Sequence, residues 1–183
     1  MNTKKRVCIF CGARMGTSPA IISEVDILIQ SLIDTGYDLV YGGGKDGIMG
    51  HIADKFLAAN QQVIGIRPEK LIADEPPSED LTELIVVKDM YERKALMIEQ
   101  SDIFIGLPGG IGTLDEVLEV FTHVKIGYID KFCAVLNFKG FYDGLDQMLD
   151  QMVTDGFLKS KEKELLTFAP TAEALMNSLN SYD

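Results

Sequence analysis

The segment Pro108–Glu116 (PGGIGTLDE) joins three glycines to the start of a helical pattern, directly after an apolar run. Gly109, Gly110 and Gly112 allow a ligand to approach the backbone closely. The first N–H groups of a helix lack internal partners, and the helix dipole adds about half a positive charge there. A phosphate or sugar oxygen can accept hydrogen bonds from these groups. The spacing matches neither the GxGxxG dinucleotide pattern nor the Walker A loop.

A second glycine cluster, Tyr41–Gly50 (YGGGKDGIMG), also links a predicted strand to a predicted helix. Gly42, Gly43 and Gly44 exceed the one or two glycines that a sharp turn needs. Two such loops at one edge of a sheet would form a nest of N–H donors for an anion. The structural alternative is a tight strand-to-helix turn. The cluster therefore indicates an anion-binding loop or a closely packed turn.

An adjacent cation pair, Arg93 and Lys94 in the sequence MYERK, lies where the next helical pattern begins. Cations at a helix N-terminus oppose the helix dipole by about 0.3–1 kcal/mol. The pair is therefore locally unfavourable unless an anion is bound. The alternative is a solvated charge pair, with Glu92 as a neighbour.

Two carboxylates, Glu116 and Glu119, are three residues apart and so share one face of the predicted helix. A carboxylate beside a sugar ring can stabilise an oxocarbenium-like transition state or orient water. Two structural alternatives stay open. The face can be an exposed acidic surface, which Thr122 would continue. The residues Thr113 to Glu116 also fit a capping box, with Thr113 as N-cap and Glu116 at the third helical position.

The cysteines and histidines indicate no metal or redox site. Cys8 and Cys11 form a CxxC, but the surrounding sequence RVCIFCG is typical of a strand, where both side chains would pack in the core. Neither His51 nor His123 has metal-ligand spacing to them. The odd cysteine count favours reduced thiols. Single histidines on helices are more often structural than catalytic.

The whole-chain properties narrow the class of protein. The chain has 183 residues, a net charge of −11 and 46% hydrophobic residues, which fits one globular domain over 1–183. Such an acidic chain lacks the basic surface of a nucleic-acid-binding protein, although a small anion needs only local donors. No run approaches the roughly 20 apolar residues of a membrane span, and nothing targets the chain elsewhere. We expect a cytoplasmic protein.

Short apolar runs alternate with helical patterns along the chain. The predicted strands are Val7–Phe10, Asp38–Tyr41, Gln62–Ile66, Glu83–Val87, Ile103–Leu107 and Ala134–Asn137. The predicted helices are Pro19–Thr35, Ile48–Ala59, Arg93–Gln100, Thr113–Lys125, Tyr142–Val153 and Thr171–Leu179. This alternation predicts a doubly wound α/β fold with a mostly parallel sheet and helices on both faces.

Ligands of such folds bind beyond the carboxyl ends of the strands. Three loops leave strands there: Gly12–Ser18, Gly42–Gly47 and Pro108–Gly112. We expect them to surround one site. The segment Pro68–Asp80, with three prolines and several acids, is predicted to be a mobile loop that could cover this site.

Taken together, YGGGKDGIMG at 41–50, MYERK at 90–94 and PGGIGTLDEVLEV at 108–120 resemble the Lonely Guy (LOG) family, once described as lysine decarboxylase-like. The opening strand and CGARMG add to the likeness, which runs from about Arg6 to Asp155. The resemblance implies a Rossmann-like fold, a homodimer and cytokinin riboside 5′-monophosphate phosphoribohydrolase activity. The products would be a free base and ribose 5-phosphate, with AMP as a further substrate or ligand. It implies neither a metal nor a redox cofactor.

The resemblance also assigns residues. Arg93 and Glu116 correspond to the catalytic pair, and Lys94 to a nucleotide-binding position. The implied binding loops and further contacts are Gly42, Gly43, Gly44, Gly109, Gly110, Ile111, Gly112, Thr113, Leu114, Asp115, Thr122 and, for reading the base, Glu75. Independently of the resemblance, Glu119 is a candidate for assisting Glu116 because the two share one helix face.

Lys45, Ala13 and Arg14 depart from the serines that the family often has at these positions. Lys45 and Arg14 add positive charge near the expected phosphate, so they strengthen its binding or alter which nucleotide fits.

Two other functions stay open beside hydrolysis. A nucleotide or cofactor carrier on the same fold would need no Arg93–Glu116 pair. A decarboxylase would need a lysine that binds pyridoxal phosphate, and Lys94 is the one lysine beside a site motif, without the sequence context for an aldehyde cofactor.

Overall fold

The computed structural model describes residues 4–72, 77–78 and 80–182. Within them, seven strands form one sheet in the order β4-β3-β2-β1-β5-β6-β7, and all neighbouring strands are parallel. The strands are β1 (Arg6–Phe10), β2 (Asp38–Tyr41), β3 (Val63–Pro68), β4 (Glu83–Val87), β5 (Ile103–Gly106), β6 (Phe132–Leu136) and β7 (Thr167–Ala169). The strand order reverses between β1 and β5, which is where such folds bind ligands.

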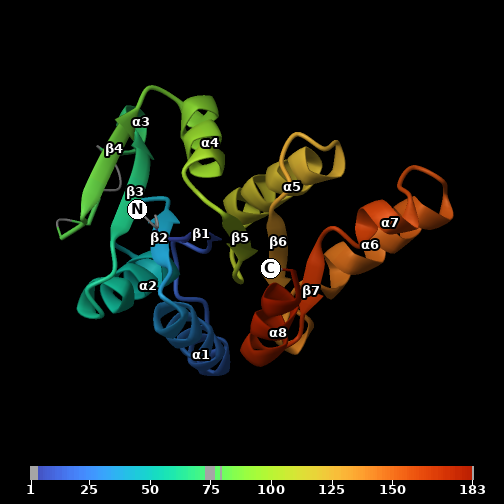
Figure 1. Ribbon diagram of the computed structural model, residues 1–183, viewed down its shortest axis with the longest axis horizontal. Coiled ribbons are helices and arrows are strands. Elements are labelled where there is room, and N and C mark those ends of the chain that lie inside the picture. Colours follow the sequence, from blue (N-terminus) through green and yellow to red (C-terminus); the bar gives the residue numbers. More distant parts are fainter. Residues whose placement is uncertain (1–3, 73–76, 79, 183) are drawn as a thin grey trace.

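Helices cover both faces of the sheet, as Figure 1 shows. One face carries α1 (Pro19–Thr35), α2 (Gly47–Ala58) and α8 (Ala172–Tyr182), which pack into one apolar core cluster. The opposite face carries α4 (Met90–Glu99), α5 (Ile111–Lys125) and α6 (Asp143–Thr154), which form a second cluster. The short elements are α3 (Glu69–Ile72), η1 (Phe138–Gly140) and α7 (Ser160–Lys163). The predicted doubly wound α/β fold is therefore confirmed.

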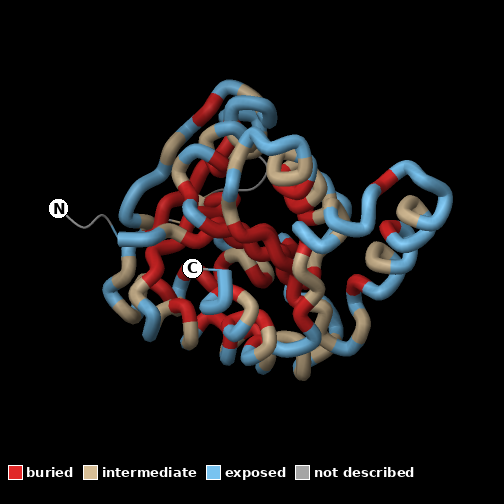
Figure 2. Tube along the Cα trace, turned by 45° about the vertical axis from the view of Figure 1, so that its right-hand side comes forward, coloured by how far each residue is buried: buried red, intermediate tan, exposed pale blue. Residues whose placement is uncertain are grey.

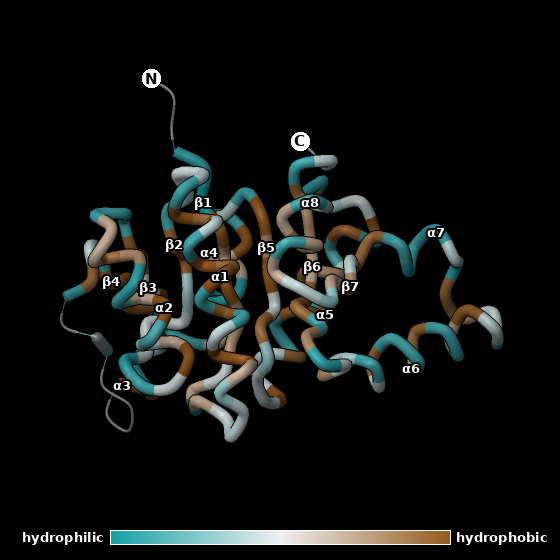
Figure 3. The backbone as a smooth tube through the Cα atoms, turned by 90° about the horizontal axis from the view of Figure 1, so that it is seen from below, coloured by the Kyte–Doolittle hydropathy of each residue, from teal (hydrophilic) through white to brown (hydrophobic). Residues whose placement is uncertain are grey.

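The strands are apolar on both sides because each side meets a layer of helices. In β1, Val7 and Ile9 face the first cluster, whereas Cys8 and Phe10 face the second. Cys11 packs with Ile9, so both cysteines of the CxxC contribute to the core, as predicted. Buried residues run through the centre of the molecule in Figure 2, and the apolar colour of Figure 3 follows the strands.

The predicted element boundaries are mostly within a few residues of those observed. Helix α1 begins with Pro19 after Ser18 and ends at Gly36, which adopts the left-handed conformation with φ 91°. Strand β3 extends to Pro68, two residues beyond the predicted end at Ile66. β7, α3, η1 and α7 are additional elements of three or four residues, too short to show a period in the sequence.

Helices α4 and α5 start earlier than predicted, and this changes two interpretations. Helix α4 begins at Met90, with the Asp89 carboxylate accepting N–H bonds from the first turn. Arg93 therefore lies beyond the first three helical residues, which removes the argument from an unfavourable dipole. Helix α5 begins at Ile111 with Gly110 as its N-cap, so the predicted capping box from Thr113 is wrong.

The segment Pro68–Asp80 is described in part. Its first residues close β3 and form α3. Near its end, Pro77 forms an isolated bridge with Gly44, and the Ser78 N–H donates to the Gly43 carbonyl. These described parts lie against the second glycine cluster. No helix among the described residues is both long enough and apolar enough to cross a membrane.

Candidate active site

A cleft of about 280 Å³ opens at the carboxyl ends of the central strands. Its lining includes Arg67 and Arg93 as well as Gly112, Thr113 and Glu116 of helix α5. The loop after β1 contributes to the floor. The cleft therefore lies beside the switch point between β1 and β5, as the fold predicts.

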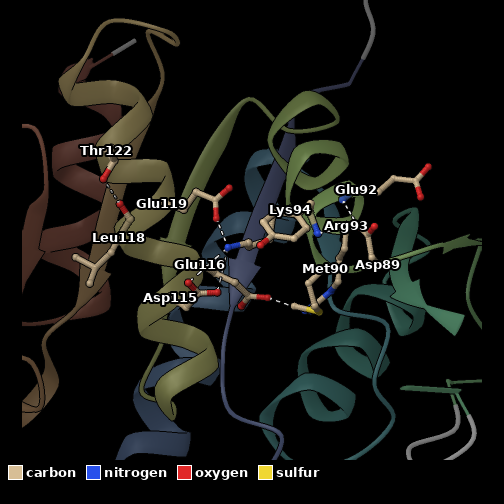
Figure 4. Close-up of polar contacts among 11 residues, drawn as sticks. Asp89, Met90, Glu92, Arg93, Lys94, Asp115, Glu116, Leu118, Glu119 and Thr122 are labelled. Carbon is tan, nitrogen blue, oxygen red and sulfur yellow. Dashed lines mark hydrogen bonds and ion pairs between the residues drawn. The ribbon is translucent and has the colours of Figure 1, made fainter. Parts of the chain in front are cut away.

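Arg93 and Glu116, the two residues that the family resemblance pairs, contact each other at this cleft. Arg93 Nη1 lies 3.0 Å from Glu116 Oε1, and the two side chains are 11% and 9% exposed. Arg93 Nε also donates to the Ile66 carbonyl at 3.1 Å, which fixes the guanidinium at the end of β3. Figure 4 shows Glu116 reaching from α5 toward Arg93 on α4. The arrangement is a buried carboxylate held beside a cation.

The charge on Glu116 is set by opposing effects. Burial raises the pKa of its carboxyl above the ordinary value, and the Arg93 guanidinium counteracts that rise. A carboxyl of this kind can be ionised near neutral pH and still take up a proton more readily than an exposed glutamate. Such a group, placed in a cleft, suits charge stabilisation or acid–base chemistry.

The first turn of α5 has glycines that packing does not explain. A methyl group added at Gly110 or at Gly112 would meet no atom within 4 Å, and neither glycine has a positive φ. Both line the cleft, together with the buried Thr113. By contrast, Gly109 is packed against the Thr113 side chain. The free space over Gly110 and Gly112 therefore fits a ligand at the helix N-terminus.

The other residues of this loop point away from the cleft. Ile111 is 82% exposed, and Leu114 packs on the core cluster beneath α5. Within Val117–Val124, the apolar side chains, which a dimer could also bury, pack in the same intrachain cluster, whereas Thr122 is exposed.

Close packing explains why the second cluster contains glycines. Gly42 lines the cleft, and a methyl group there would stand 2.4 Å from Arg93 Nη2. Gly43 has φ 73° and lies against Gly65 of β3. Gly47 has φ 62°, and its close neighbour is the loop at Ala13. The tight-turn interpretation therefore accounts for these glycines, and Gly42 is the one of them that lines the cleft.

Lys94 and Thr122 do not line the cleft. Lys94 Nζ contacts Glu119 and lies 3.2 Å from Asp115 Oδ2, and Figure 4 shows it between these two carboxylates. The hydrogen bond to Glu119 is the main reason that the pKa of Lys94 is raised. The Thr122 hydroxyl donates to the Leu118 carbonyl at 2.7 Å within α5. The ion pairs of Lys94 instead join α4 to α5 behind Glu116.

A larger cavity of about 580 Å³ adjoins the cleft on the other side of Gly12 and Ala13. Its walls include Arg14, Met15 and Phe141. The departures Ala13 and Arg14 therefore lie beside it, whereas Lys45 is exposed and lines neither space.

Arg67 is a charged cleft residue that was not predicted from the sequence. The predicted strand ended at Ile66 and the predicted loop began at Pro68, so Arg67 was assigned to neither. The strand continues instead, and Arg67 is 2% exposed with Nη1 donating to the Gly42 carbonyl at 3.1 Å. The sequence does contain a hint that the strand continues, because Arg67 directly follows the apolar run VIGI and precedes a proline.

The two histidines have structural contacts, and one predicted site residue lies outside the described part of the chain. His51 pairs with Asp26 at 2.6 Å, and His123 packs edge-on against Tyr128. Glu75 lies outside the described residues. Within residues 4–72, 77–78 and 80–182, no cluster of three or more His, Cys, Asp or Glu could hold a metal ion.

Comparisons with known proteins relate the chain to a protein family and to named relatives. A family model described as possible lysine decarboxylase matches residues 49–179. The chain is 41% identical over 178 residues to "Cytokinin riboside 5′-monophosphate phosphoribohydrolase LOG5" of Arabidopsis thaliana, covering 97% of this chain and 78% of the relative. It is 40% identical over 178 residues to the probable phosphoribohydrolase LOGL3 of Oryza sativa subsp. japonica, covering 97% and 84%.

Solved structures share the fold at lower identity. A molybdenum cofactor binding protein from Rippkaea orientalis matches with TM-score 0.70 and 22% identity over 98% of both chains. The molybdenum cofactor carrier protein of Chlamydomonas reinhardtii matches with TM-score 0.72 and 15% identity, again over 98% of both. At these identities the likeness extends to the fold alone.

Proposed function

The chain belongs to the Lonely Guy (LOG) family, whose model carries the description possible lysine decarboxylase, and we infer that it is a nucleoside 5′-monophosphate phosphoribohydrolase. It hydrolyses the N-glycosidic bond to give a free base and ribose 5-phosphate. A cytokinin riboside 5′-monophosphate, as in the names of the relatives, and AMP are the proposed substrates.

The observation that carries this proposal is the buried pair of Arg93 and Glu116 at the cleft. Breaking a glycosidic bond develops positive charge at the anomeric carbon, which a nearby carboxylate stabilises. We assign this role to Glu116, together with holding the ribose hydroxyls and orienting the attacking water. Arg93 keeps Glu116 ionised and positions it, and it binds the nucleotide beside the scissile bond. Glu119 is a candidate for assistance, through the Lys94 contact behind Glu116.

We place the phosphate at the first turn of α5. The N–H groups of Ile111, Gly112 and Thr113 lie at the positive end of the helix dipole, where a phosphate is stabilised. The open space above Gly110 and Gly112 supports this placement. The loop at Gly42 forms the facing wall.

The contacts of Lys94 argue against decarboxylation through a lysine-bound aldehyde. Formation of a Schiff base requires a neutral amine, which enzymes obtain by lowering a lysine pKa. Here the hydrogen bond that Lys94 donates to Glu119, together with the neighbouring Asp115 carboxylate, raises the pKa of Lys94. The ammonium form is therefore favoured, and an absorbance band of an internal aldimine is not expected.

The direct test is a panel of nucleoside 5′-monophosphates incubated with the purified protein, with free base and ribose 5-phosphate both quantified. We expect equimolar products from AMP or from a cytokinin riboside 5′-monophosphate. Binding without product across the whole panel would contradict hydrolysis and favour the alternative of a nucleotide or cofactor carrier.

We further propose that the protein forms one domain over 1–183, works as a homodimer in the cytoplasm and requires neither a metal nor a redox cofactor. The apolar side chains of Tyr91 and Ile111, in the first turns of α4 and α5, are exposed, which supports an interface there. Analytical ultracentrifugation tests the dimer, and activity in the presence of a chelator tests the metal requirement.

A further inference from the structure

The cavity of about 580 Å³ beside the cleft has no role in the reaction as described so far. The cavity and the cleft share Gly12, Ala13 and Gly110 in their linings, so the two spaces adjoin. The cavity has the volume of pockets that bind small molecules, about 300–1,000 Å³, whereas the cleft holds about 280 Å³. A ligand confined to the cleft would leave the larger of the two spaces unfilled.

Arg14 gives this cavity a positive charge. It is the one charged residue among the described residues that line the cavity, in a chain whose net charge is −11. Its side chain is exposed, and it forms no hydrogen bond or ion pair within the described part of the chain. A guanidinium presents N–H donors in a planar fork that matches two phosphate oxygens. The lining therefore favours a ligand with an anionic group.

The cavity also offers an aromatic surface. Phe141, in the segment between β6 and α6, lines the cavity and keeps 46% of its surface exposed. Its ring packs edge-on against Tyr142, with 4.9 Å between the ring centroids, and the Tyr142 hydroxyl donates to the Leu107 carbonyl at 2.7 Å. The ring is thus held by a residue that is itself fixed to the end of β5. A planar base can stack on such a ring.

Gly110 connects the cavity to the proposed position of the phosphate. It lines both spaces, and a methyl group added to it would meet no atom within 4 Å. A phosphate bound at the first turn of α5 lies beside Gly110, with its ribose toward Glu116 in the cleft. A group attached to the other side of this phosphate would then extend into the cavity.

We propose that the cavity binds the part of a nucleotide that lies beyond its 5′-phosphate, so that the substrates include dinucleotides joined through a diphosphate. Arg14 binds the second phosphate, and the second base stacks on Phe141. This inference rests on the proposed function and widens its substrate class. The reaction is the same: water adds to the anomeric carbon, the bond from that carbon to the base nitrogen breaks, and the base leaves with a proton. The diphosphate stays intact.

The test compares AMP, ADP and diadenosine diphosphate. ADP adds the second phosphate alone, and diadenosine diphosphate adds the second phosphate together with a second nucleoside. Release of adenine by the wild type measures hydrolysis. Calorimetry in the Glu116→Gln background, where turnover is expected to be slow, measures the Kd of each ligand. Thermal melting of every variant monitors folding.

Two variants of the cavity have matched controls elsewhere in the chain. Arg14→Gln removes the cation, and Lys161→Gln removes the same charge from an exposed residue of α7 that lines neither space. Phe141→Ala removes the ring, and Phe157→Ala removes a ring that is 82% exposed and lines neither space. Both controls should leave the Kd of all three ligands unchanged.

We expect the wild type to release adenine from diadenosine diphosphate with a kcat/KM at least equal to that for AMP. Arg14→Gln should raise the Kd for ADP and for diadenosine diphosphate by about two- to fivefold, the effect of an exposed charge pair, and change the Kd for AMP by less than about 1.5-fold. Phe141→Ala should raise the Kd for diadenosine diphosphate by about 3- to 10-fold, because a stacking contact is lost, and leave the Kd values for AMP and ADP unchanged.

Three results would overturn the inference. The first is a wild type that binds diadenosine diphosphate at least fivefold more weakly than AMP, because the cavity then has no room for the second nucleoside. The second is an equal loss for all three ligands in Arg14→Gln, which would mean that Arg14 binds the 5′-phosphate itself. The third is unchanged affinity for diadenosine diphosphate in folded Phe141→Ala. If that variant fails to fold, Phe141→Leu, which keeps an apolar side chain without the ring, decides the same point.

The binding measurements separate this inference from the proposed function. Loss of diadenosine diphosphate binding in both cavity variants, with no base released from any nucleotide by the wild type, would reject hydrolysis and leave the second-nucleoside site standing. Release of adenine from AMP alone, with diadenosine diphosphate neither bound nor cleaved, would keep the proposed function and reject the inference.

Discussion

Arg93 on α4 and Glu116 on α5 meet at 3.0 Å in a cleft where both side chains are largely buried. The two helices follow strands at different places in the sheet, β4 at its edge and β5 beside β1. Their ion pair therefore links separate βα units at the point where the substrate must sit. Next to Arg93 in the sequence is a second cation, Lys94, and one turn after Glu116 is a second carboxylate, Glu119. These two residues pair with each other outside the cleft, so their variants serve as controls.

Glu116→Gln should abolish most turnover and retain substrate binding. The change removes the charge that stabilises the transition state, which commonly costs about 3–4 kcal/mol, or about 100- to 1000-fold in kcat. Glutamine keeps the shape and can still accept a hydrogen bond from Arg93. Steady-state kinetics and calorimetry with AMP measure the two effects. Glu119→Gln removes the same charge one turn further along α5 and should cost far less, so wild-type kcat in Glu116→Gln would refute the assignment.

Arg93→Met should destabilise the protein by about 3 kcal/mol at neutral pH, because it leaves the Glu116 carboxylate buried without its ion-pair partner. The double variant Arg93→Met/Glu116→Gln should recover part of this loss, since the buried charge is then absent. Urea denaturation of the wild type, both single variants and the double variant gives the coupling energy. Strict additivity would show that the two side chains do not interact in the folded protein.

The stability deficit of Arg93→Met should also depend on pH in a defined direction. Burial already raises the pKa of Glu116, and losing Arg93 removes the main group that lowers it. A carboxyl with a raised folded-state pKa favours folding when protonated, and this contribution is lost as the pH rises through that pKa. The deficit should therefore shrink on acidification and grow toward neutral pH. A pH-independent deficit would contradict this.

The acid limb of kcat/KM should lie above the pH at which ordinary glutamates titrate, about 4.3, because catalysis requires ionised Glu116 and its pKa is raised. Glu119→Gln should move this limb to lower pH, since the Glu119 charge contributes to the rise. The measurement is the pH profile of AMP hydrolysis for both proteins. An acid limb at the ordinary glutamate pKa would mean that another group controls the profile.

The sheet could be predicted because buried parallel strands leave short apolar runs, each closed by glycine, proline or polar residues. Strand β7 has only three residues, of which Ala169 alone is buried, and this is too short a run to distinguish from a loop. The first residues of the helices were harder to predict. Asp89 and Gly110 are the N-caps of α4 and α5, but other residues in each segment could also act as an N-cap.

The candidate site was predictable to the level of its motifs. The pairing of Arg93 with Glu116 followed from the motifs taken together with the family resemblance, whereas the physical role of each glycine did not. Gly110 and Gly112 border open space, but Gly42 and Gly43 are small because Arg93 and β3 approach them. That difference depends on contacts between distant segments.

Gly42→Ala offers a way to displace Arg93 without altering any charge. The added methyl group would stand 2.4 Å from Arg93 Nη2 and 3.2 Å from Met49 Sδ, both in long side chains that can move. We therefore expect the fold to persist, with a loss of stability of about 1–3 kcal/mol. Displacing a catalytic group by about 1 Å can cost about 100-fold in rate. The kcat/KM for AMP should fall by about 10- to 100-fold.

Gly144→Ala is the matched control for this change. Gly144 lies in α6 with no atom within 4 Å of the added methyl group, so the substitution should stabilise the helix by about 0.5–1 kcal/mol and leave kcat/KM unchanged. Urea denaturation and AMP hydrolysis of both variants separate the effects. If Gly42→Ala keeps full activity, the position of the Arg93 guanidinium over Gly42 is not the one that catalysis uses, and Arg93 must act from another rotamer.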